Sequence, residues 1–189
     1  MRKINWDGVN TADAFARPTA GAYIAVITDA KDYEDKELIR VEWDYHSGEF
    51  ANYNANTKKR AGFWPAAFNQ SYKEKALPYF KRFKNSVEQS NPRFVFDEDD
   101  VRALEGCLVG VVLGEEQYKK NNGGVGVRVY VHKTIPVSAV ERGEYTIPPL
   151  KMLPKGTETF SGHYGTEYDV ANAPTFADID DDDLGNLPF

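Results

Sequence analysis

The sequence predicts a mostly β domain with one main helix, followed by a separate acidic tail. Several segments alternate apolar and polar residues with the period of a strand, and one longer segment has the period of a helix. The chain has 189 residues, of which 41% are hydrophobic and 13% aromatic, enough for one core of ordinary size. We therefore expect one domain over residues 1–155, which begins with a polar arm, and a flexible linker with an acidic tip over residues 156–189.

Three strands are predicted before the helix. Residues 22–28 are β-branched and aromatic, and residues 38–45 alternate strictly, which places Trp43 on the buried face. The Ser47-Gly48 pair predicts a turn into a third strand over residues 50–57.

The main helix is predicted over residues 68–89. Its aromatic inner stripe would consist of Phe68, Tyr72, Phe80 and Phe83. Pro78 either kinks this helix or opens a second helix at its first position, and Asn91-Pro92 ends it.

Two more strands follow, over residues 106–113 and 125–131. The Asn121-Asn122-Gly123-Gly124 segment between them predicts a hairpin, and Cys107 reads as a buried structural thiol. In the last strand the alternating valines are expected in the core, with Arg128, Tyr130 and His132 on the opposite face. Residues 136–155 are expected to be an extended segment that closes the body.

Three strands, a helix and two strands form the element order of the OB-fold, a five-stranded Greek-key barrel. Other five-stranded α+β domains have a similar order, so the element order leaves them open. We expect a barrel over the body of the chain.

The charge is divided unequally along the chain. All 23 Lys and Arg residues lie within residues 1–155, whereas eight of the 29 acidic residues come later. The body therefore carries 21 acids and a net charge of about +2, and the tail carries −8. The acidic overall pI belongs to the tail and does not exclude a nucleic-acid-binding body.

Two segments combine cations with aromatic rings, the two groups that bind single-stranded nucleic acid without sequence preference. The first segment contains Lys58, Lys59, Arg60, Phe63 and Trp64, which we interpret as a loop. The second segment is the last hairpin and strand, with Tyr118, Lys119, Lys120, Arg128 and Tyr130. The hairpin between the last two strands forms one wall of the oligonucleotide groove in an OB-fold.

The acidic tip predicts a site for partner proteins. Four consecutive aspartates repel one another and stay solvated, and a small apolar group follows them at the end of the chain. The candidate partner-binding residues are Asp180, Asp181, Asp182, Asp183, Leu187, Pro188 and Phe189. The alternative is a tail that only adds solubility.

Enzymatic motifs are absent from the sequence. The three histidines are scattered and Cys107 is the single cysteine, so no zinc-ligand spacing occurs, and neither phosphate-binding nor dinucleotide-binding glycine patterns occur. The acidic group at residues 97–100 is read as a solvated turn rather than a metal site of a nuclease. We expect no catalysis, cofactor or metal, and a cytoplasmic location, because no signal peptide or membrane-length apolar run occurs.

The chain resembles a group of small single-stranded-DNA-binding proteins encoded by phages of Gram-positive bacteria. The resemblance covers the acidic tip and residues 20–23, 37–44, 62–64, 71–78, 110–116 and 148–151. It implies an OB-fold and sequence-tolerant binding of single-stranded DNA during phage replication or recombination in the host cytoplasm. The tip departs from the pattern of the group, because Leu184-Gly185-Asn186 separate the aspartates from Leu-Pro-Phe. The alternative is an acidic adaptor whose body binds protein rather than DNA, and the oligomeric state stays open.

Overall fold

An antiparallel sheet and one long helix make up most of the structure, which is a computed structural model that describes residues 16–62, 64, 66–121 and 123–153. Within these ranges the chain forms, in order, β1 (Gly21–Tyr33), β2 (Leu38–Tyr45), α1 (Tyr53–Ala61), β3 (Ala67–Ser71), α2 (Leu77–Ser90), β4 (Leu108–Lys119), β5 (Val125–Ile135) and α3 (Val137–Glu141). The prediction of a mostly β domain with one main helix is therefore confirmed.

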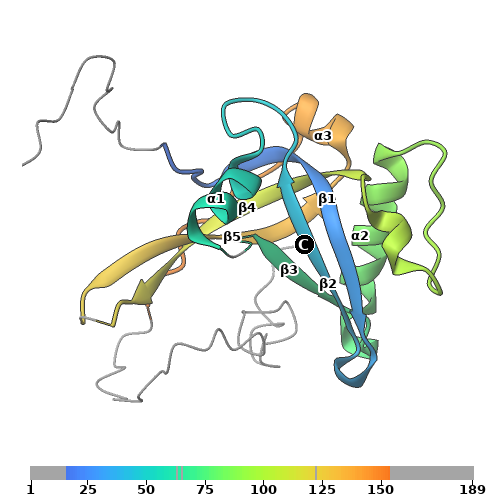
Figure 1. Cartoon of the computed structure of the whole chain (residues 1–189), viewed down its shortest axis with the longest axis horizontal. Helices are drawn as coiled ribbons and strands as arrows, with labels where there is room; N and C mark the ends of the chain where they lie inside the picture. The colour runs from blue at the N-terminus through green and yellow to red at the C-terminus, as the bar shows by residue number, and fades with distance from the viewer. Residues whose placement is uncertain (1–15, 63, 65, 122, 154–189) are drawn as a thin grey trace, which may run out of the picture.

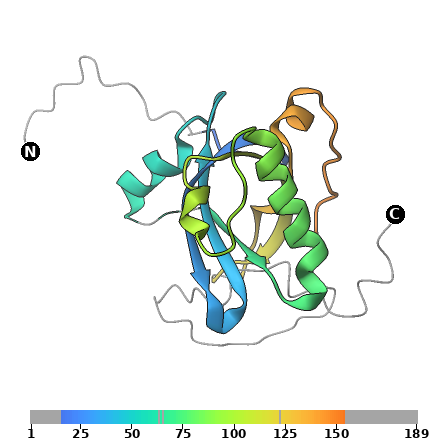
Figure 2. The same cartoon turned by 90° about the vertical axis from the view of Figure 1, so that its right-hand side faces the viewer.

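The sheet has the strand order β3-β2-β1-β4-β5, and every neighbouring pair is antiparallel. β1 is long enough to pair with both β2 and β4, so it joins the two halves of the sheet. The sheet is open, with β3 and β5 as its edge strands in the described part of the chain. Figure 1 shows the strands crossing one another at steep angles, with α1 and α2 at opposite ends of the sheet (Figures 1 and 2).

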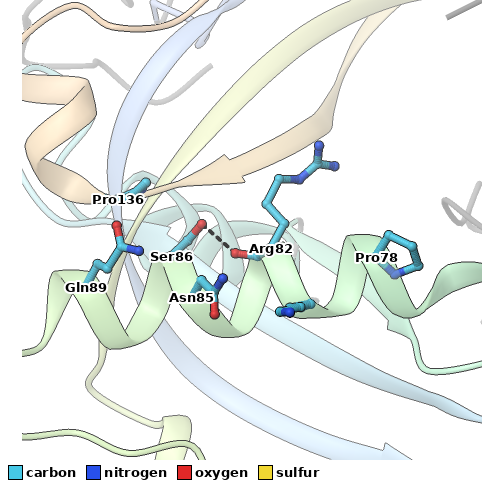
Figure 3. Close-up of a pocket in the computed structure, with 7 residues that line it drawn as sticks. Pro78, Arg82, Asn85, Ser86, Gln89 and Pro136 are labelled. Atoms are coloured by element: carbon cyan, nitrogen blue, oxygen red, sulfur yellow. Dashed lines mark hydrogen bonds between the residues drawn. The ribbon is translucent and has the colours of Figure 1, made fainter. Parts of the chain in front are cut away.

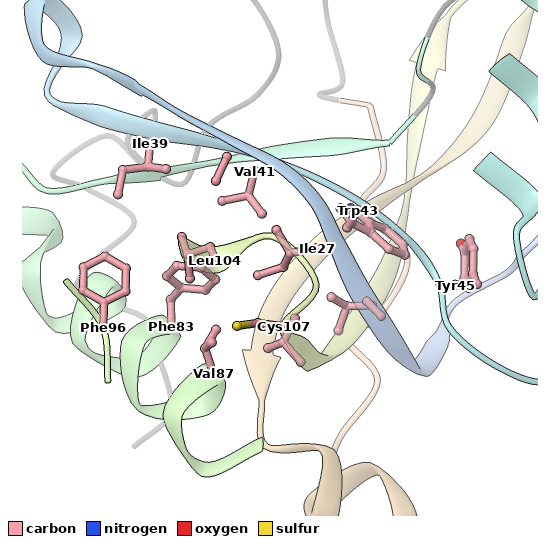
Figure 4. Close-up of a cluster of buried hydrophobic side chains, with 14 of the residues drawn as sticks. Ile27, Ile39, Val41, Trp43, Tyr45, Phe83, Val87, Phe96, Leu104 and Cys107 are labelled. Carbon is pink, nitrogen blue, oxygen red and sulfur yellow. The ribbon is translucent and has the colours of Figure 1, made fainter. Parts of the chain in front are cut away.

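The core lies between the sheet and α2. Phe83 and Val87, one helical turn apart, point from α2 toward Leu104 and the strands (Figure 4). Trp43 and Cys107 are both buried, as predicted. Burial raises the pKa of the Cys107 thiol and so keeps it protonated.

The third strand was predicted wrongly at residues 50–57. This segment is a turn followed by α1, which begins after Asn52 with its positive φ of 59°. The carboxylate of Asp44 accepts hydrogen bonds from the backbone N–H groups of Asn54 and Ala55, each at 2.9 Å. The N–H groups in the first turn of a helix have no acceptor within the helix. Asp44, which lies on β2, supplies that acceptor and so stabilises the start of α1.

The predicted start of the main helix is also wrong. Phe68 lies on β3 opposite Val41 of β2, and α2 begins only at Leu77, with Pro78 in its first turn. Pro78 therefore opens a helix rather than kinking one, which was one of the two alternatives. The helix ends at Ser90, directly before Asn91-Pro92, as predicted.

β4 and β5 extend beyond the core as a two-stranded ribbon, formed by residues 114–119 and 125–130 (Figure 1). The predicted hairpin at residues 121–124 is confirmed by the strands on either side of it. The prediction that the valines of the last strand are buried is wrong for Val125, Val127 and Val129, which are 55%, 53% and 38% exposed. These residues lie on the core side of the sheet, but the ribbon extends past the elements that cover the core.

The segment after β5 is only partly extended. It begins with the short helix α3, where the sequence had indicated an extended chain, and Lys151 then forms a parallel bridge with Glu116 of β4. None of the helices in the described ranges has the length and apolar character needed to cross a membrane. Most of the predicted N-terminal arm, at residues 1–15, and the tail from residue 154 lie outside the described residues.

Candidate nucleic-acid interface

One face of the ribbon carries two tyrosines that each cover a glycine on the opposite strand. Tyr118 pairs with Gly126, and Tyr130 pairs with Gly114. A Cβ atom added at either glycine would come within 2.7 Å of the facing tyrosine ring. The absence of a side chain at these glycines therefore lets both rings lie close over the ribbon, with Arg128 and Glu116 between them on the same face.

Cations lie over both rings. The guanidinium carbon of Arg128 is 5.7 Å from the ring centroid of Tyr118, and Lys151 Nζ is 4.3 Å from the ring centroid of Tyr130. Arg128 Nε is also 2.6 Å from Glu116 Oε1, so a local acid already offsets part of its charge. Burial, followed by the charge of Glu116, raises the pKa of the Tyr130 phenol and keeps it neutral.

The two rings differ in how accessible they are. The side chain of Tyr130 is half-buried, with its hydroxyl in the interior, whereas Tyr118 is exposed near the tip of the ribbon beside the exposed Lys119 and Lys120. Tyr118 is therefore the ring on this face with the most surface available for a ligand.

The first predicted segment, residues 58–64, is not the loop that the sequence suggested, because its start belongs to α1. Lys58 and Lys59 are exposed in the last turn of α1, where cations favour the negative end of the helix dipole. Lys58 Nζ lies 5.4 Å from the ring centroid of Trp64, and Trp64 Nε1 donates a hydrogen bond of 3.2 Å to the carbonyl oxygen of Trp43. Trp64 is thus a half-buried ring, fixed to β2 on one side and accompanied by a cation. The side chain of Arg60 and all of Phe63 lie outside the described residues.

A third group of cations and a ring was missed in the sequence. Lys31 and Lys36 place their Nζ atoms 5.3 Å and 5.9 Å from the ring centroid of Tyr33, at the turn between β1 and β2. The Lys31-Asp32-Tyr33 spacing within a strand could have indicated this group, because residues two apart lie on one face. Lys151 was missed as well, since no local pattern predicts its bridge to β4.

A shallow hollow of about 320 Å³ lies along α2 beside Pro136, which follows β5 (Figure 3). Its lining residues are Pro78, Lys81, Arg82, Asn85, Ser86, Gln89 and Pro136. The lining contains two cations and no acid, so the hollow is a separate basic surface on the far side of the core from α1 (Figure 2).

The acidic group after α2 has the form of a turn. The backbone N–H of Asp99 donates to Asp97 Oδ1 at 2.9 Å, and residues 97–100 are exposed. In the part of the chain that the structure describes, no three His, Cys, Asp or Glu side chains are grouped as metal ligands would be. The candidate partner-binding residues 180–183 and 187–189 lie outside the described residues.

No protein-family model matches the chain, and no curated protein matches it. The class that the structure defines is therefore a structural one: a mostly β protein with an open, five-stranded antiparallel sheet and one main helix.

Proposed function

We propose that this protein binds single-stranded DNA without sequence preference, through an OB-fold barrel that is open between β3 and β5. Three features of the topology support this fold. β1 pairs with both β2 and β4, β5 pairs with β4, and the main helix lies between β3 and β4. An OB-fold is a partly open, five-stranded Greek-key barrel that binds oligonucleotides with its β1–β2 and β4–β5 loops.

The observation that carries the proposal is the repeated pairing of a ring with a cation on the surface. Tyr118 with Arg128 lies on the β4–β5 ribbon, and Tyr33 with Lys31 and Lys36 lies at the β1–β2 turn. These are the two loops that an OB-fold uses, and each supplies a flat face for a base and a charge for a phosphate. The remaining pair, Lys58 with Trp64, adds a further ring next to β2.

The test is a titration of the full chain with a fluorescently labelled oligo-dT at two salt concentrations, with duplex DNA as the competitor. Binding should weaken steeply with salt, because each cation on a phosphate contributes a slope of about −0.7 in log affinity against log salt. Duplex should compete poorly. An affinity for oligo-dT that does not change with salt would refute the proposal.

Single substitutions locate the site. Tyr118→Ala should weaken binding roughly 5- to 150-fold, since stacking on one ring contributes about 1–3 kcal/mol per base. Replacing Lys119 and Lys120 together by Ala should reduce the salt slope by about 1.4. Arg93→Ala is the matched control, because this exposed cation lies in the turn after α2, away from all three ring and cation groups.

We further propose that the acidic tip recruits other replication or recombination proteins in the host cytoplasm. The tip has the opposite charge to the basic surfaces of the body, so it also competes with DNA for them. Deleting residues 178–189 should tighten binding to oligo-dT at low salt, and an unchanged affinity would exclude the competition.

The tail and the body can be tested separately. Residues 156–189 fused to an inert carrier protein should retain the partners that the full chain binds. If the carrier fusion retains them and the body shows no salt-dependent binding to oligo-dT, the protein is an acidic adaptor instead.

A further inference from the structure

On the face of the ribbon opposite Tyr118, β5 carries an exposed row of valines beside the polar row Glu115, Gln117 and Lys119 of β4. Val125, Val127 and Val129 form the valine row, with more than a third of each side chain accessible to solvent. Lys151 shares the Tyr118 face, because it forms a parallel bridge with Glu116. Its two neighbours, Leu150 and Met152, are exposed apolar residues beside the ribbon, at 40% and 66%.

The same valines present unpaired backbone groups along the outer edge of β5. The N–H of Gln117 donates to the carbonyl oxygen of Lys151 at 2.9 Å, and the N–H of Lys151 donates to the carbonyl oxygen of Glu115 at 3.0 Å. The N–H of Gln117 and the C=O of Glu115 thus point away from β5. The cross-strand pairs Gln117–Val127 and Glu115–Val129 are therefore non-hydrogen-bonded pairs of the β4–β5 ladder. In an antiparallel ladder such residues direct their N–H and C=O groups to the other side. No strand in the described ranges pairs with that edge of β5.

We propose that this edge pairs with the same edge of a second copy of the chain, antiparallel, around a two-fold axis at Val127. Each Val127 then faces the other, and Val125 faces Val129 of the second copy. All the outward backbone groups of these residues find partners, and the six valines form one continuous stripe. An exposed strand edge without proline is a ready template for such pairing.

Avoidance of unfavourable cross-strand pairs selects this register. An axis at Arg128 would place the two arginines directly opposite each other, which is destabilising, and an axis at Gly126 would place Val129 opposite Gly123. With the axis at Val127, each Arg128 instead faces Gly126 of the second copy, beside the Tyr118 ring that covers this glycine. The cross-strand row through Val125 then has Lys119 at one end and Glu115 of the second copy at the other.

Disulfide trapping in the full chain tests the register without DNA, so its outcome is independent of the proposed function. The Cα atoms of a hydrogen-bonded antiparallel pair are about 5.5 Å apart, within the range of about 4.4–6.8 Å that a disulfide spans. Val127→Cys should therefore form a disulfide-linked dimer under mild oxidation. Arg128→Cys should not, because its two copies would be roughly 8 Å apart, beyond disulfide range.

A mixed experiment makes the test sharper. Val125→Cys and Val129→Cys proteins should cross-link when mixed and not when oxidised separately, because each faces the other across the axis. The wild-type chain, whose one cysteine is the buried Cys107, is the background control. Equal cross-linking at positions 127 and 128, or none at 127, would overturn the proposal.

Sedimentation equilibrium tests the association without oxidation. Val127→Lys should weaken dimerisation roughly tenfold or more, because two like charges would face each other at the axis. Val95→Lys is the matched control, since Val95 is exposed on the turn after α2. Circular dichroism of both variants should match the wild type. A wild-type chain that stays monomeric up to the millimolar range would overturn the proposal.

Discussion

The carboxylate of Asp44 should be among the most important single groups for the stability of the domain outside the apolar core. The side chain is only 3% exposed. It accepts three backbone N–H groups: those of Tyr45 at 2.8 Å and of Asn54 and Ala55 at 2.9 Å each. Hydrogen bonds to a charged acceptor are stronger than neutral ones, and a carboxylate with this many donors can be buried without a cation.

The expected magnitude follows from the donors that Asp44→Ala would leave. A buried N–H without a partner costs about 1–3 kcal/mol. Two of the three donors are buried and Ala55 N–H is partly accessible to water, so we expect a loss of about 3 kcal/mol in the free energy of unfolding. For a domain of this size the corresponding fall in Tm is roughly 6–12 °C. Asp44→Asn keeps one carbonyl oxygen and should lose about half as much.

Urea denaturation followed by circular dichroism measures these losses directly. Glu42→Ala is the matched control on the same strand, because Glu42 makes only a partly exposed ion pair with Arg40 at 3.7 Å. Such a pair contributes less than about 1 kcal/mol. If Asp44→Ala is no more destabilising than Glu42→Ala, the assignment of Asp44 as the cap of α1 is wrong.

Three further predictions concern the core and the last strand. Phe83→Ala should destabilise the domain by about 3–5 kcal/mol in urea denaturation, because this ring is fully buried between α2 and the sheet. Gly110→Ala should lower the free energy of unfolding by roughly 1–3 kcal/mol, since the new Cβ would lie 2.8 Å from the backbone carbonyl oxygen of Ile135, and normal stability would refute the close approach. Burial lowers the pKa of His132 below its usual 6.5, so the unfolded chain binds the extra proton first as the pH falls. Stability measured by urea denaturation should therefore fall below about pH 6.5, and His132→Gln should flatten this fall. The neighbouring cations that act in the same direction on His132 are Lys133, Lys151 and Arg82.

The accuracy of the fold prediction depends on whether the decisive interactions are local. β2 was predicted to the residue, because the side chains from Leu38 to Trp43 follow the two-residue period of a sheet with one buried face; only Asp44, buried as the cap of α1, departs from it. The start of α1 could not be predicted, because its cap is a carboxylate ten positions earlier in the sequence. Phe68 was assigned to a helix because a four-residue step to Tyr72 fits both a helix and a strand, and only pairing with β2 decides between them.

The candidate site shows the same division. Alternation correctly placed Arg128 and Tyr130 on one face of β5, and the hairpin sequence correctly placed Tyr118 near its tip. Alternation also correctly grouped the valines, but it cannot tell whether the elements that cover the core reach as far as Val125 and Val127. Lys151 could not be placed beside Tyr130 from the sequence, because its pairing with β4 joins positions 35 residues apart.

The two proposals for the ribbon do not require the same atoms. The two-residue period gives one face of β5 to Arg128 and Tyr130 and the other to the valines, while the edge between them carries the unpaired backbone groups. An antiparallel edge pairing has its two-fold axis perpendicular to the sheet, so equivalent faces of both copies lie on the same side. The Tyr118 faces of two copies would then form one continuous surface, long enough for a single strand to cross from one copy to the other. A change at Val127 would therefore affect strand binding only through loss of the second copy, whereas a change at Tyr118 would affect it directly in a single chain.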